Sequence, residues 1–184
     1  WFGPDSSNDA INWQKDADHL LKFYHDVGIR YFKIDSMKTQ NATALRNQRA
    51  FFDRMLRGSD CNMVFDLDVT AEIRPGYFGL PDIGPLFVEN RYTDFHSYWP
   101  HQTLRTLWQL SHVVDPLRLR IEFLNNQRNQ DKYPNDPLAP AAYRADTLFA
   151  ITLFANPLGW FEVSNLPAEF VQEVKPLIAV WKKE

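Results

Sequence analysis

The sequence lacks most of the features that mark cofactor, membrane and nucleic-acid proteins. It has one cysteine, Cys61, so an internal disulfide is excluded and the cellular compartment is not indicated. No apolar run approaches the length of a membrane span, and a net charge of −3 gives no basic surplus for nucleic acid. We find no glycine-rich phosphate loop, no metal-ligand cluster and no internal repeat. We therefore expect no cofactor and no metal, and neither nucleic acid nor a membrane as a partner.

Aromatic and apolar residues are plentiful by contrast. The chain has 184 residues, of which 45% are hydrophobic, so one domain with an ordinary core can form. Aromatic residues make up 15% and include six tryptophans, which either fill a core or stack on sugar rings. The chain begins at Trp1, with neither an initiator methionine nor a signal peptide in the given sequence.

Apolar periodicity predicts alternating strands and helices, which is typical of a parallel sheet. Acidic residues follow successive strands at Asp35, Asp68 and Asp94, and a (β/α)8 barrel builds its active site at that edge. Four or five units are too few for a closed barrel of eight. We therefore expect residues 1–184 to be one partial catalytic barrel domain, roughly the latter half, from a larger enzyme. The predicted strands are 31–36, 63–68, 86–91 and 117–124, with a short strand or turn near 157–160, and the predicted helices are 10–27, 41–57, 100–110, 141–154 and 167–182.

Local signals bound the first two helices. Asn8 or Asp9 can cap the first, and Gly28 is placed to end it. Thr39 or Asn41 can cap the second.

The strand at 31–36 ends in a lysine and a carboxylate. Side chains alternate across a strand, so Lys33 and Asp35 should point to the same side. A nearby ammonium lowers the pKa of a carboxylate, which suits a nucleophile that must be ionised at working pH. A structural ion pair at a strand end explains the same residues equally well.

Two other strands carry charged residues on one face. Asp66 and Asp68 share a face of the second strand by the same alternation. In the fourth strand Arg118, Arg120 and Glu122 share a face, and we expect a half-exposed strand with a ladder of charges there rather than a catalytic site.

The motif Tyr31-Phe32-Lys33-Ile34-Asp35, with Ile11-Asn12-Trp13 and Gly28-Ile29-Arg30 before it, resembles the K-x-D region of glycoside hydrolase family 36. This is the α-galactosidase or melibiase family, which is similar to family 27 and to the raffinose synthases. The resemblance covers nearly the whole chain and implies a (β/α)8 barrel that carries appended β-domains in the family.

The resemblance also implies roles for individual residues. Asp35 would be the nucleophile, and Lys33 would bind substrate hydroxyls. Arg91-Tyr92-Thr93-Asp94 is similar to the family's R-x-S-D, which makes Asp94 the acid/base and places Arg91 against the sugar or Asp94. Glu89 and Glu72 are the competing acids.

The remaining expected substrate contacts come from two other places. Asp68, or less favourably Asp66, occupies the strand that supplies a sugar contact in the family. Trp1 and Asp5 would add contacts at the rim. The aromatic residues of the loop expected to desolvate the acid are Tyr92, Phe95, Tyr98 and Trp99.

The implied activity is that of a retaining exo-glycosidase that removes terminal α-galactosyl residues from oligosaccharides or glycosides. Retention needs two carboxyl groups about 5–5.5 Å apart. One alternative is a related α-glycosidase or transglycosylase with another terminal sugar, and the other is an excised barrel fragment without activity. The expected partners are the α-galactoside substrate and the missing N-terminal half of the barrel, with self-association through open sheet edges.

Overall fold

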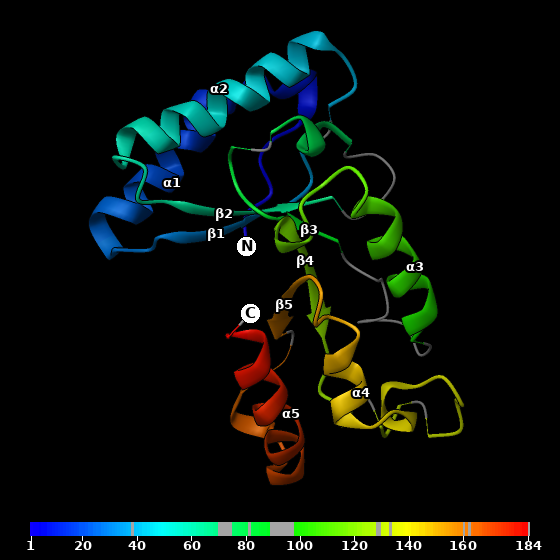
Figure 1. The fold of residues 1–184 in the computed structure, drawn as a ribbon. Coiled ribbons are helices and arrows are strands. Elements are labelled where there is room, and N and C mark those ends of the chain that lie inside the picture. Colours follow the sequence, from blue (N-terminus) through cyan, green and yellow to red (C-terminus); the bar gives the residue numbers. More distant parts are fainter. Residues whose placement is uncertain are drawn as a thin grey trace. The chain divides into compact units, whose positions relative to one another are not determined.

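The structure is a computed structural model, and it divides into two compact units, Trp1–Phe87 and Val88–Glu184 (Figure 1). The described residues are 1–37, 39–69, 75–80, 82–88, 98–127, 130–132, 134–159, 161 and 163–183.

The first unit is a layer of parallel strands with two helices. Strand β1 pairs in parallel with β2, and β2 pairs in parallel with β3. Phe2 adds an isolated parallel bridge to Ile34 on β1. The elements are α1 (Trp13–Val27), β1 (Tyr31–Ile34), α2 (Ala42–Gly58), β2 (Val64–Asp68) and β3 (Leu86–Phe87).

The ends of the two helices test the predicted caps. Gly28 ends α1 in the left-handed conformation with φ +79°, as predicted. Asn41 caps α2, because its side-chain oxygen accepts the N–H groups of residues 43 and 44 at 2.9 Å. The predicted cap at Asn8 or Asp9 is wrong, since both lie in a 3-10 turn with positive φ and α1 begins only at Trp13.

Alternation along β1 and β2 gives this layer an apolar face and a polar face. The apolar face carries four buried side chains and packs against α1 and α2 (Figure 1), with the Phe52 and Phe65 rings 5.3 Å apart. The polar face carries Tyr31, Lys33 and two aspartates of β2. The four apolar residues are Phe32, Ile34, Phe65 and Leu67.

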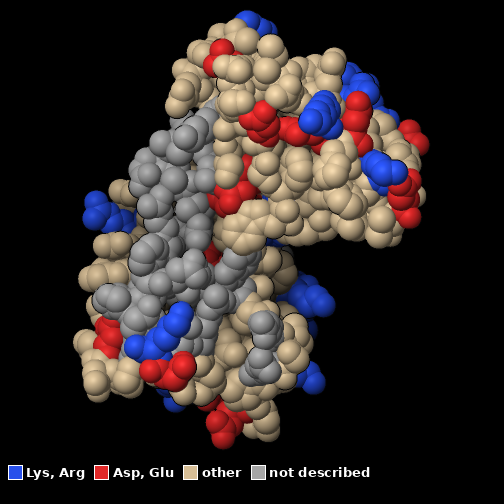
Figure 2. Space-filling model, turned by 180° about the vertical axis from the view of Figure 1, so that it is seen from behind, with Lys and Arg blue, Asp and Glu red and all other residues tan. Residues whose placement is uncertain are grey.

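Acidic and basic side chains are interspersed over the surface that Figure 2 shows. In the first unit, Arg54 Nε lies 2.6 Å from an oxygen of Asp18, and both side chains are about half exposed. Exposed pairs of this kind contribute little to stability. The Arg54–Asp18 pair is therefore a useful reference for the buried ion pair between Lys33 and Asp68.

The second unit also combines parallel strands with helices. Strand β4 pairs in parallel with β5, and the Val88 N–H donates to the Arg120 carbonyl at 2.8 Å. The rings of Phe123, Phe149 and Phe170 join β4 to the two C-terminal helices in one core. The elements are α3 (Pro100–Leu110), β4 (Leu119–Phe123), α4 (Ala145–Ala150), β5 (Asn156–Gly159) and α5 (Ala168–Trp181).

Two predictions for the second unit are wrong. Helix α4 is much shorter than the predicted 141–154, because a separate 3-10 turn at Pro140–Ala142 precedes it and the backbone at Tyr143 and Arg144 is extended. Glu122 is fully buried rather than half exposed. Tyr98, itself buried, lies near enough for the Glu122 charge to act on it, so this face of β4 is covered at Glu122, whereas Arg118 and Arg120 are partly exposed as predicted.

The α/β class with parallel strands is confirmed. Within each unit, neighbouring strands follow the order of the chain, which is the order found in a (β/α)8 barrel and is compatible with a part of one. No helix among the described residues is long and apolar enough to cross a membrane.

Candidate active site

Asp35 lies directly after β1, on a turn that fixes its carboxylate. The indole N–H of Trp1 donates to one carboxylate oxygen at 2.8 Å, and the backbone N–H of Ser36 donates to the other at 2.6 Å. Ser36 has φ +60°, a left-handed conformation that costs energy for a residue other than glycine and is often found at functional sites. Hydrogen bonds to a carboxylate favour its ionised form, so this turn presents an oriented anion.

Lys33 is buried on the polar face, two residues before Asp35. Its Nζ lies 2.5 Å from an oxygen of Asp68, which is also buried. The same Nζ lies 3.5 Å from the centroid of the Trp1 ring and 4.5 Å from that of Phe87. Cation–π contacts and an ion pair together offset the cost of burying the ammonium.

The structure therefore brings four predicted site residues together, namely Trp1, Lys33, Asp35 and Asp68. Trp1 contacts both Lys33 and Asp35, as expected for residues two apart on one strand. The ion pair that the structure gives Lys33 is with Asp68, whereas the sequence suggested Asp35 as its neighbour.

Asp66 is the second buried acid of β2, and Tyr31 accompanies it. The Tyr31 hydroxyl donates to an oxygen of Asp66. The two aspartates of β2 thus meet different groups, a neutral phenol at Asp66 and an ammonium at Asp68. Sequence reasoning missed Tyr31, although it lies two residues before Lys33 and so faces the same side.

Among the described residues, the side chain of Asp5 forms its hydrogen bonds with the segment that leads into α1. Its oxygens accept hydrogen bonds from the N–H and hydroxyl of Ser7 and from the side-chain amide of Asn12. These bonds, the Ser7 hydroxyl first, lower the pKa of Asp5 to about 2. By ordering this turn they also explain why α1 begins after Asn12 rather than at the predicted caps.

We expect Asp5→Ala to lower the free energy of unfolding at neutral pH, by an amount that depends on pH. The pKa of Asp5 is depressed from 3.8, so its contribution is present above about pH 4 and is lost as the pH falls through about 2. Urea denaturation of both proteins between pH 2 and pH 7 measures this. A difference between variant and wild type that is the same at every pH would contradict the assignment.

The expected acid/base lies outside the described residues. Asp94, Arg91, Glu89 and Glu72 all belong to the ranges 70–74 and 89–97 that the structure does not describe. Their predicted roles, and the distance between the two expected catalytic carboxyl groups, stay predictions. Of the aromatic loop, Tyr92 and Phe95 lie outside the described residues, Tyr98 is buried and Trp99 is partly exposed.

Tyr98 belongs to the core of the second unit. Burial, and then the charge of Glu122, raise the pKa of Tyr98 well above its ordinary value. The Tyr143 hydroxyl donates to the Tyr98 carbonyl at 3.1 Å. Sequence reasoning missed Glu122 as a buried acid, since alternating charges alone do not distinguish a buried strand face from a solvent-exposed one.

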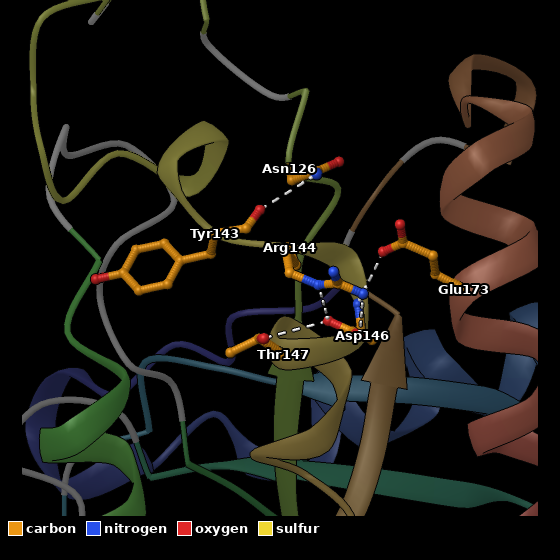
Figure 3. Close-up of polar contacts among 6 residues, drawn as sticks. All are labelled: Asn126, Tyr143, Arg144, Asp146, Thr147 and Glu173. Carbon is orange, nitrogen blue, oxygen red and sulfur yellow. Dashed lines mark hydrogen bonds and ion pairs between the residues drawn. The ribbon is translucent and has the colours of Figure 1, made fainter.

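A second polar cluster surrounds the start of α4 (Figure 3). Arg144 makes two hydrogen bonds to Asp146, at 3.1 and 2.7 Å, and the Thr147 hydroxyl donates to the same carboxylate. Glu173 on α5 accepts the Asp146 backbone N–H at 3.4 Å. The Arg144 hydrogen bond is the main cause that lowers the pKa of Asp146. This exposed network links α4 to α5.

Metal ligation has no candidate among the described residues, because no three histidine, cysteine, aspartate or glutamate side chains gather there. The chemistry that the polar face can support is that of a fixed carboxylate beside a buried ammonium. No protein-family model matches the chain, and neither does any of the curated proteins searched.

Proposed function

We propose that the chain is part of the catalytic barrel of a retaining α-galactosidase similar to glycoside hydrolase family 36, with Asp35 as the nucleophile. The observation that carries this proposal is the anchored carboxylate of Asp35, which receives one N–H on each oxygen. It lies at the C-terminal end of a parallel strand, the edge at which barrel enzymes build their active sites.

The proposed reaction has two displacements. An oxygen of Asp35 attacks the anomeric carbon of a terminal α-galactosyl unit while the bond to the leaving oxygen breaks. An acid, which we assign to Asp94, gives its proton to that oxygen. The same residue then takes a proton from water, and the water oxygen displaces Asp35 to release galactose with its configuration retained.

In this proposal Lys33 and Asp68, on the polar face of β1 and β2, form a polar wall beside the nucleophile. Both are buried and charged, and they are 2.5 Å apart, so they hold each other in a fixed geometry. Sugar hydroxyls both donate and accept hydrogen bonds, so an ammonium and a carboxylate side by side suit a pair of neighbouring hydroxyls. The assignment of galactose as the terminal sugar comes from the resemblance to glycoside hydrolase family 36.

Hydrolysis of 4-nitrophenyl α-galactoside tests the proposed activity. We expect release of nitrophenol, with little from the α-glucoside or the β-galactoside as matched controls. Proton NMR of the first product should show the α anomer of galactose, since two inversions retain configuration. A first product in the β form would contradict the retaining mechanism, and no turnover would favour the alternative of an inactive fragment.

A further inference from the structure

The side chain of Trp1 contacts both Lys33 on β1 and Asp35 directly after it. Its indole N–H donates to Asp35 at 2.8 Å, and its ring lies 3.5 Å from the Lys33 ammonium. The residue is nevertheless 71% exposed. Much of the indole is therefore exposed to solvent, while its N–H contacts Asp35 and its ring contacts Lys33.

The backbone beside Trp1 explains why the indole is held in place. The Phe2 N–H donates to the Lys33 carbonyl at 2.9 Å, and the Asp35 N–H donates to the Phe2 carbonyl at 2.8 Å. These two bonds lock the residue after Trp1 in parallel register with Ile34. The backbone of Phe2 is therefore hydrogen-bonded to both Lys33 and Asp35, and this fixes the position of the neighbouring residue, Trp1.

We propose that Trp1 is the positioning residue of Asp35: its indole N–H fixes the carboxylate orientation, while its ring covers the Lys33 ammonium. This inference rests on the proposed function for its catalytic meaning. A carboxylate oxygen held by a donor at 2.8 Å loses rotational freedom, so the attacking oxygen is already oriented when substrate binds. The role differs from stacking on a sugar, which needs the exposed part of the ring and not its N–H.

The substitution Trp1→Phe separates these roles, because phenylalanine keeps an aromatic ring but has no N–H. Trp108→Phe is the matched control, since Trp108 is 64% exposed and lies on α3 in the second unit. The first readout is a pH titration of the Asp35 carboxyl carbon by NMR in protein labelled with ¹³C-aspartate, assigned by the signal lost in Asp35→Asn. This readout needs no turnover.

We expect the Asp35 signal of Trp1→Phe to titrate at a higher pH than in wild type, because the carboxylate has lost a hydrogen bond that favours its ionised form. Trp108→Phe should titrate as wild type does. On 4-nitrophenyl α-galactoside, Trp1→Phe should lower kcat roughly 10-fold and change KM less than about threefold, the pattern of a misplaced nucleophile.

Three results would overturn the proposal. One is an Asp35 titration that Trp1→Phe leaves unchanged, and another is an equal change in Trp108→Phe. The third is a raised KM with unchanged kcat, which would make Trp1 a sugar platform only. Failure of the proposed function appears separately, as absence of galactoside turnover in the wild-type chain, and the titration still decides whether Trp1 positions Asp35.

Discussion

Asp35→Asn is expected to lower kcat on 4-nitrophenyl α-galactoside by at least roughly 1,000-fold. Asparagine keeps the size of the side chain, and its amide oxygen can accept the Trp1 N–H, but its NH2 group cannot accept the Ser36 N–H and it has no negative charge with which to attack the anomeric carbon. Because the side chain is half-buried at the end of β1, we expect only a small change in the free energy of unfolding. Initial rates and urea denaturation of the same preparation separate the two effects.

Two further variants sharpen this test. Asp60→Asn changes an exposed carboxylate in the turn after α2 and should leave kcat unchanged. Asp35→Ala leaves space at the nucleophile position, so added azide should restore turnover and form a β-galactosyl azide by a single displacement. Wild-type turnover in Asp35→Asn would remove Asp35 from the mechanism.

Asp68→Asn is expected to lower the free energy of unfolding by about 3 kcal/mol, because it leaves the Lys33 ammonium buried without its ion-pair carboxylate. Lys33 is only 7% exposed, and its Nζ lies 2.5 Å from Asp68. The Trp1 and Phe87 rings that also contact the ammonium are weaker partners than a carboxylate. Urea denaturation followed by far-UV circular dichroism measures the change.

A matched exposed pair and a double variant serve as controls. Asp18→Asn removes the partner of Arg54 from an ion pair that is about half exposed, and it should cost less than about 1 kcal/mol. Adding Lys33→Met to Asp68→Asn should recover more than half of the loss, since neither member of the ion pair is then charged. If Asp68→Asn costs no more than Asp18→Asn, the Lys33–Asp68 pair is solvated and the buried polar wall is not present.

Local chemistry predicted the parts of the fold that depend on a few neighbouring residues. Gly28 ends α1 because the chain needs positive φ there, and Asn41 caps α2 with its own side chain. The two-residue period of a strand likewise placed Lys33 and Asp35 where one residue, Trp1, touches both. The two helix ends depend on neighbouring residues alone, whereas the contact of Trp1 with Asp35 joins residues 34 positions apart.

The features that the sequence did not reveal depend on contacts between distant residues. The ion pair of Lys33 with Asp68 follows from the register of β1 against β2, which the sequence does not state. The burial of Glu122 was missed because a covered strand face and a solvent-exposed one have the same alternation of charges. The late start of α1 follows from Asp5, which binds Ser7 and Asn12.

Trapping the covalent intermediate tests most directly whether Asp35 is the nucleophile. A 5-fluoro-α-galactosyl fluoride reacts as a substrate but slows the second displacement, so the glycosyl-enzyme accumulates. Peptic digestion and mass spectrometry then identify the modified residue. We expect one fluorogalactosyl group on the peptide that contains Asp35, esterified to that carboxylate. A group on the peptide that contains Asp66 and Asp68 instead would contradict this assignment.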